Sequence, residues 1–201
     1  MATAGTAYRQ VLKELEKGKY KPVYYLMGDE AFFIDSIADY IREHALPEEA
    51  RDFNQLVLYG NETSMNEVIQ RARAYPMGSD RQVIIVKEAQ HLMKKDSESG
   101  GSASDILSAY LQQPQMSTVL VFCHKNGSLD KRKKIVAVIE KSGVLFESKK
   151  VKDEDLPQFV EEFLNELEYP HGQELPSAHR GRVGVCSTWR QQGQRLDVCR
   201  Q

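Results

Sequence analysis

Short apolar runs alternate with amphipathic stretches along the chain up to residue 148. The apolar runs are rich in β-branched and aromatic residues, which is typical of buried strands. They predict five strands, at residues 23–27, 55–60, 81–87, 117–123 and 144–148. Because helical stretches separate the strands, this order predicts an α/β fold in which helices cover both faces of a parallel, five-stranded sheet.

The amphipathic stretches repeat their apolar residues at helical spacing. They predict helices at residues 8–15, 33–41, 65–72, 106–111 and 135–139. Ser64 and Glu67 have the spacing of a capping box ahead of the third helix, and Asp130 is expected to cap the fifth, which Gly143 ends. The polar, glycine-rich stretch 94–104 predicts a loop.

The chain changes character beyond the last strand. Residues 156–167 form one more amphipathic stretch and no strand follows, so we interpret residues 149–170 as the start of a small helical domain. Residues 171–201 hold 5 Arg, no Lys and 2 acidic residues, and they contain the only Trp of the chain. Because this segment has almost no apolar periodicity, we expect an atypical tail that is disordered or frame-shifted.

The segment VYYLMGDEAFFIDSI, residues 23–37, begins like a phosphate-binding unit, with a strand, a glycine turn and a helix. A P-loop would place a second glycine, a lysine and a serine or threonine in this region. Here Asp29 and Glu30 follow Gly28 and no such lysine is present. Two carboxylates at the turn would repel a triphosphate.

The end of the third predicted strand also departs from the pattern of a working ATPase. An ATPase of this class usually has an aspartate at the end of that strand, where it holds magnesium. Here Lys87 occupies that position and Glu88 follows it. With both halves altered, the sequence predicts a degenerate nucleotide site that does not bind nucleotide.

Composition and charge limit the class of protein. The chain has 201 residues, of which 41% are hydrophobic and 28% charged, as in soluble globular proteins. The net charge of −2 argues against a dedicated nucleic-acid-binding protein. No apolar run approaches the roughly 20 residues that cross a bilayer. The N-terminus also lacks the features of a signal peptide, so we predict a cytoplasmic protein that does not associate with membranes.

Other candidate sites are weak. Cys123 and His124 are adjacent, so their side chains leave a strand on opposite faces and make a poor nucleophile–base pair. Glu30, Asp35 and Asp39 are better explained as solvated charges of a helix than as an acid–base pair. Four residues of the last segment could bind zinc in principle, although their spacing matches no usual site: His171, His179, Cys186 and Cys199. The sequence therefore predicts no catalytic residue, no metal and no cofactor.

A basic run stands at the predicted start of the fifth helix. It consists of Lys131, Arg132, Lys133 and Lys134. The simpler explanation is an exposed, solvated helix face, and the alternative is a contact with the phosphates of DNA. Any such DNA contact is expected to be weak or indirect.

Four blocks, PVYYLMGDEAFFID, ARAYPMGSDRQVIIVKEAQ, STVLVFCHKNGSLDKRKK and GVLFESKKVKDEDLPQFV, occur in this order within about residues 5–170. Together they resemble the delta subunit of bacterial DNA polymerase III. The resemblance implies an AAA+-like fold without a functional nucleotide site. It also implies a replication protein of the clamp loader, which binds the ring-shaped sliding clamp and helps to open it for loading onto primed DNA.

The partners implied are the sliding clamp (the beta subunit) and the other loader subunits, tau/gamma and delta-prime, which include the ATPases. The chain itself is expected not to be an enzyme, although the holoenzyme is a DNA-directed DNA polymerase and hence a nucleotidyltransferase. The clamp-contacting element of the family lies at the end of a helix, just before the third strand. Here it corresponds to Ala74, Tyr75, Pro76, Met77 and Gly78.

Tyr75 and Met77 on a Pro–Gly turn suit the groove of a partner, because exposed aromatic and methionine side chains are effective anchors. Without the resemblance, the simpler explanation is that they cover the sheet. Family members often have a second large apolar residue where this chain has Gly78, which predicts that clamp affinity is either reduced or carried more by Tyr75. The resemblance further implies that residues 1–148 form the AAA+-like N-terminal domain and that the family's C-terminal collar domain is absent.

Three hypotheses follow for the function. The first is a non-enzymatic delta subunit of the clamp loader. The second is a nucleotide-binding ATPase or switch of the AAA+ or P-loop group, and the third is an α/β adaptor outside replication. Nucleotide binding separates the first hypothesis from the second, and clamp binding separates the first from the third.

Overall fold

Five strands form the sheet in the computed structural model, which describes residues 4–94, 102–130 and 132–149. They are β1 (Val23–Gly28), β2 (Gln55–Tyr59), β3 (Gln82–Lys87), β4 (Thr118–Lys125) and β5 (Val144–Ser148). Their order in the sheet is β2-β3-β4-β1-β5, and every neighbouring pair is parallel. The five predicted strands and the parallel sheet are therefore confirmed, with bounds that differ by no more than two residues.

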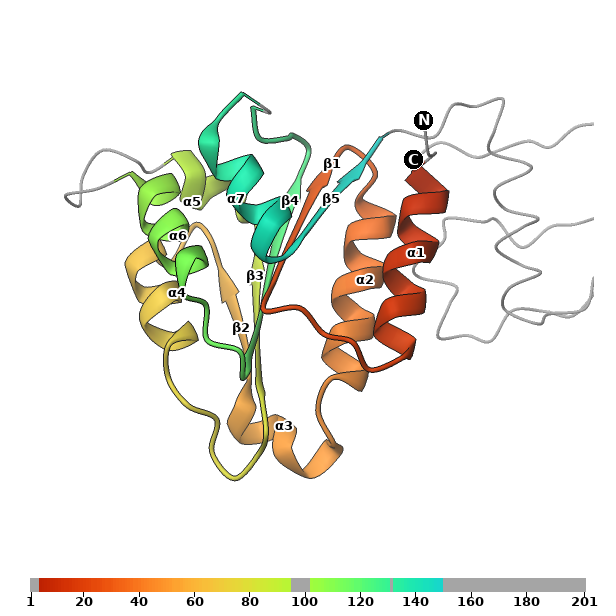
Figure 1. Ribbon diagram of the computed structural model, residues 1–201, viewed down its shortest axis with the longest axis vertical. Coiled ribbons are helices and arrows are strands. Elements are labelled where there is room, and N and C mark those ends of the chain that lie inside the picture. The colour runs from red at the N-terminus through yellow and green to blue at the C-terminus, as the bar shows by residue number, and fades with distance from the viewer. Residues whose placement is uncertain (1–3, 95–101, 131, 150–201) are drawn as a thin grey trace, which may run out of the picture. The chain divides into compact units, whose positions relative to one another are not determined.

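The described residues also form seven helices. They are α1 (Ala4–Glu16), α2 (Ala31–His44), α3 (Glu48–Asn54), α4 (Met65–Ala72), α5 (Gln90–Lys94), α6 (Ala103–Gln112) and α7 (Lys134–Ser142). Helices α1 and α2 cover one face of the sheet, and α4, α5, α6 and α7 cover the other (Figure 1). Helix α3 lies beyond the amino ends of the strands, at the lower end of Figure 1. The prediction of helices on both faces is thus confirmed.

The centre of the sheet is apolar because helices lie against both of its faces. Every residue of β1 is buried, as is nearly all of β4. Tyr25 of β1 lies beside Phe122 of β4 in the ladder, and the centroids of their rings are 5.6 Å apart. Full burial of a large apolar side chain contributes about 1.5–3 kcal/mol. The central strands therefore provide a rigid base for the turns at both ends of the sheet.

Helix α4 begins as the sequence predicts. The Ser64 hydroxyl accepts a hydrogen bond from the Glu67 amide at 3.2 Å, which satisfies one of the amides that a helix leaves without an internal partner. The Glu67 carboxylate accepts a hydrogen bond from the Thr63 hydroxyl at 2.8 Å. The cap therefore involves one residue more than the predicted box.

Other helix boundaries differ from the predictions. Asp130 does not cap α7, which starts after Lys133; its carboxylate instead accepts the Arg132 amide at 3.0 Å in a local turn. The stretch 94–104 is not all loop, because Ser102 caps α6, which begins at Ala103. The sequence does not predict the short helices α3 and α5, since neither presents enough apolar residues to show a helical period.

Several predictions fall outside the described residues. The expected helical domain at 149–170 lies there except for its first residue, and the expected tail at 171–201 lies there entirely. Among residues 4–94, 102–130 and 132–149, no helix is both long enough and apolar enough to cross a bilayer.

Candidate functional site

The turn after β1 lies at the carboxyl edge of the sheet, where a nucleotide would bind in a related fold. Gly28 has a φ of +132°, and a Cβ atom there would lie 2.0 Å from the Ser148 carbonyl oxygen. The Asp29 amide donates to that same carbonyl at 3.1 Å, and the Ser148 hydroxyl donates to the Glu30 carbonyl at 2.9 Å. An amide that could have met a phosphate is thus already bonded to the end of β5.

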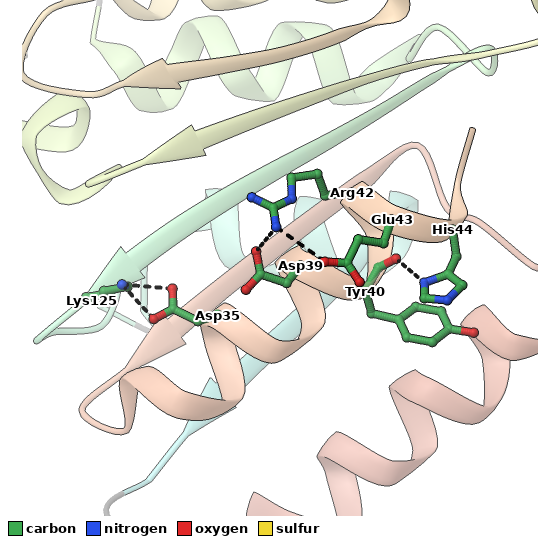
Figure 2. Close-up of polar contacts among 7 residues, drawn as sticks. All are labelled: Asp35, Asp39, Tyr40, Arg42, Glu43, His44 and Lys125. Carbon is green, nitrogen blue, oxygen red and sulfur yellow. Dashed lines mark hydrogen bonds and ion pairs between the residues drawn. The ribbon is translucent and has the colours of Figure 1, made fainter. Parts of the chain in front are cut away.

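An ion pair stands beside this turn. The Lys125 ammonium at the end of β4 lies 2.8 Å from an Asp35 carboxylate oxygen on α2, and Figure 2 shows the two side chains facing each other. Burial alone would lower the pKa of Lys125, but the hydrogen bond and the charge of Asp35 outweigh it and raise that pKa. Asp39 pairs with Arg42 at 3.2 Å on the same helix. Asp35 and Asp39 therefore pair with cations and do not form an acid–base pair with each other.

The end of β3 is also bonded to its neighbours. The Lys87 carbonyl accepts the Gly60 amide at 2.8 Å, and Glu88 adopts a left-handed backbone with a φ of 55°. The Glu88 carboxylate accepts a hydrogen bond from the Gln90 side chain. Within the described part of the chain, no cluster of three or more His, Cys, Asp or Glu side chains has the arrangement of a metal site.

The adjacent Cys123 and His124 do not form a nucleophile–base arrangement. The His124 Nδ1 atom lies 2.8 Å from the Tyr25 hydroxyl, with which it shares a buried hydrogen bond. Burial raises the pKa of the Cys123 thiol to about 12, so the nucleophilic thiolate is scarce at neutral pH. The four residues considered for zinc all lie beyond residue 149, outside the described residues.

The basic run precedes and begins α7. Lys131 lies outside the described residues, whereas Arg132, Lys133 and Lys134 are exposed. The Arg132 guanidinium lies 3.4 Å from the Asp130 carboxylate. The arrangement is compatible with both explanations of the run, and the DNA contact stays a prediction.

The predicted clamp-contacting residues lie at the opposite, amino edge of the sheet. Residues 74–78, here called the tip, belong to the connection between α4 and β3. Tyr75 is 79% exposed and Met77 is 70% exposed, while Pro76 between them is half-buried. The two side chains therefore do not cover the sheet. Gly78 ends the tip with a φ of +63°, a conformation that glycine adopts without strain.

The main chain of the tip is hydrogen-bonded to two amide side chains, those of Asn54 and Gln82. The Asn54 carboxamide accepts the Met77 amide at 2.6 Å and donates to the Met77 carbonyl at 2.9 Å. Gln82, the first residue of β3, donates to the Ala74 carbonyl at 2.6 Å and to the Thr118 hydroxyl at 2.8 Å. Asn54 and Gln82 were not among the residues predicted from the sequence, and only their polar character beside predicted strands could have drawn attention to them.

Two further apolar side chains are exposed at the same edge. Phe53 is 74% exposed and immediately precedes Asn54, and Met116 is 76% exposed and lies just before β4. Segments that precede parallel strands lie at one edge of the sheet, so both residues share the edge of the tip. Of the large apolar residues exposed in the described chain, Tyr59 differs in lying at the carboxyl end of β2.

Comparisons with known proteins give a consistent picture. The model of the family described as "DNA polymerase III, delta subunit" matches residues 24–149. The DNA polymerase III subunit delta of Bacillus subtilis (strain 168) is 30% identical over 151 residues, which are 75% of this chain and 44% of that protein. The solved Bacillus subtilis DNA clamp loader delta protein superposes with a TM-score of 0.69 at 26% identity, over 80% of this chain and 48% of that one. The chain thus spans less than half the length of either relative.

Proposed function

The chain belongs to the family of DNA polymerase III delta subunits, and from this premise we propose that its tip binds the sliding clamp within a clamp loader. The solved Bacillus subtilis relative is a DNA clamp loader delta protein, which supports the clamp-loading role. The AAA+-like sheet would then act as a scaffold that presents a binding turn.

One observation carries the proposal. Tyr75 and Met77 are largely exposed, although a hydrophobic side chain gains free energy by leaving water. They stand on a turn whose main chain is bonded to the body of the domain, so little order has to be gained when a partner binds. Such a pair of anchors fits an apolar groove on a partner, as the predicted clamp contact requires.

The proposal extends to the action of the loader. By occupying the groove of the clamp, the tip would help to hold one interface of the ring open, while the tau/gamma and delta-prime subunits complete the assembly. The energy would come from ATPase subunits, because the turn after β1 in this chain is bonded to Ser148 and carries Asp29 and Glu30. Nucleotide binding by this chain remains the alternative hypothesis.

The test is the affinity of the full chain for a bacterial sliding clamp, measured by surface binding. Replacing Met77 or Tyr75 by alanine should each cost on the order of 1–3 kcal/mol of binding free energy, as loss of an anchor does. Matched controls are Met116→Ala and Tyr59→Ala, which remove exposed side chains of the same types outside residues 74–78; Met116 lies at the same edge of the sheet and Tyr59 at the opposite one. We expect both controls to bind like the unaltered chain.

The unfolding transition of each variant distinguishes binding from stability. Because Tyr75 and Met77 are exposed, the alanine variants should unfold at nearly the same urea concentration as the unaltered chain. Failure of the unaltered chain to bind the clamp would reject the proposal. Equal losses of affinity for the tip variants and their controls would reject the tip as the site.

A further inference from the structure

Asn54 is a buried polar residue whose side chain forms hydrogen bonds with Met77, 23 positions further along the sequence. It is 4% exposed and ends α3, one residue before β2. Its Nδ2 atom donates to the Ala50 carbonyl at 3.0 Å and to the Met77 carbonyl at 2.9 Å, while its Oδ1 atom accepts the Met77 amide at 2.6 Å. Both bonds to Met77 are made to the main chain, in the manner of a neighbouring strand.

This arrangement needs a carboxamide. An aspartate keeps the acceptor for the Met77 amide but has no donor for the carbonyl groups of Ala50 and Met77. A serine is too short to bridge the amide and the carbonyl of one residue, and an alanine removes all three bonds, which lie in a partly buried setting. Asparagine alone among these four residues supplies both the acceptor and the donor that the arrangement uses.

The two ends of the tip are fixed independently. Gln82 holds the Ala74 carbonyl at one end, and Asn54 holds both main-chain groups of Met77 at the other. Tyr75 and Pro76 lie between these fixed points, and Pro76 restricts the backbone further by its ring. Of the two fixed points, Asn54 acts on one of the exposed anchors itself.

We propose that Asn54 is a positioning residue for clamp binding, which fixes the main chain of Met77 so that the anchors are ordered before the partner arrives. This inference rests on the proposed function of the tip. A turn whose main chain is ordered beforehand loses less freedom on binding, and the gain appears as affinity. Asn54 itself is buried, so it acts through Met77 and not by touching the clamp.

The experiment combines two measurements on the full chain and on three variants. Hydrogen exchange reports whether the Met77 amide is protected in the free protein, and surface binding reports the affinity for a sliding clamp. The variants are Asn54→Ala, Asn54→Asp and the control Ile139→Val. Ile139 is fully buried on α7, so its truncation lowers stability modestly without changing the contacts of the tip.

In Asn54→Ala we expect fast exchange at Met77 and clamp affinity reduced by about tenfold, because the tip must then be ordered on binding. Asn54→Asp should lose affinity as well, since the Met77 carbonyl then faces a carboxylate. Ile139→Val should keep the protection of Met77 and the affinity of the unaltered chain. A structural role alone would lower the stability of the Asn54 variants and would leave their clamp affinity unchanged, as in Ile139→Val.

The outcomes separate this inference from the proposed function. If Met77→Ala weakens clamp binding while Asn54→Ala changes neither exchange nor affinity, the role of Asn54 is overturned and the proposed function stands. Faster exchange with unchanged affinity also overturns it, because the order at Met77 would then not matter for binding. If the unaltered chain does not bind the clamp at all, both proposals fail.

Discussion

The two edges of the sheet differ in which parts of a turn are bonded to the rest of the domain. At the carboxyl edge, the turn after β1 is bonded to the end of β5, and Lys125 and Asp35 pair beside it. At the amino edge, the side chains of Asn54 and Gln82 form hydrogen bonds with the main chain of the tip, and the side chains of Tyr75 and Met77 stay exposed. The bonds at the carboxyl edge occupy main-chain groups of the turn itself, whereas the bonds at the amino edge hold the main chain of the tip and leave its side chains exposed, as the proposed clamp contact requires.

The largest difference between the edges should appear at their glycines. Gly28→Ala would place a Cβ atom 2.0 Å from a main-chain oxygen at a φ of +132°, so we expect a loss of about 3–5 kcal/mol in the free energy of unfolding. A Cβ atom at Gly78 would meet nothing within 4 Å, so Gly78→Ala should cost only about 1 kcal/mol for its positive φ. Urea unfolding of both variants measures the contrast. Equal losses would show that the two turns are equally constrained.

Alkaline pH should destabilise the fold through the buried thiol of Cys123, near the carboxyl edge of the sheet. Burial raises the pKa of Cys123 from 9.0 to about 12, so between these values the unfolded chain has lost a proton that the folded chain retains. The unfolded state then binds fewer protons, and the free energy of unfolding falls as the pH rises through this window. Urea unfolding at a series of pH values should show this slope, and Cys123→Ala should reduce it. A slope identical in the variant would assign the effect to other groups.

Removing the ion pair at the carboxyl edge should have a smaller effect. The side chains of Lys125 and Asp35 are 24% and 48% exposed, so solvent screens their attraction. Asp35→Asn should lower the free energy of unfolding by less than about 1 kcal/mol, and added salt should diminish the difference. A larger loss that salt does not affect would show that the pair stabilises the closed edge more strongly than its exposure implies.

The smallest expected effect is that of nucleotide. Because Asp29 and Glu30 stand at the turn and the Asp29 amide is already bonded to Ser148, ATP with magnesium should leave the unfolding temperature unchanged. A ligand that binds the folded state raises that temperature. An increase that grows with ATP concentration would therefore show that the folded chain binds ATP, and it would favour the nucleotide-binding hypothesis.

The strands were predictable because burial on both faces makes a strand almost continuously apolar, a signal that needs no knowledge of its neighbours. Helix α3 was not predictable, because the buried residue that it contributes is Asn54, which is polar. Asp130 misled the prediction since an aspartate can bond to its own local turn as well as cap a helix. Both α3 and the local turn at Asp130 depend on hydrogen bonds of polar side chains, which the periodicity of apolar residues does not reveal.

The candidate site divides in the same way. The resemblance drew attention to residues 74–78, and the proposed clamp contact uses the exposure of Tyr75 and Met77. The supports of the tip could not be found from the sequence, because Asn54 and Met77 are separated by 23 positions. An asparagine next to a strand is common, and only the folded chain shows which main-chain groups it reaches.

The contacts of Asn54 and Gln82 with the tip have a consequence for protein engineering and for divergence. They reach main-chain atoms of Ala74 and Met77, so the scaffold does not depend on which side chains occupy positions 75 and 77. For the proposed clamp contact, the side chains at positions 75 and 77 can therefore be replaced while the main chain of the tip stays bonded to the scaffold. A library randomised at these two positions would retain its fold, and new binding preferences could be selected without compensating changes in the core.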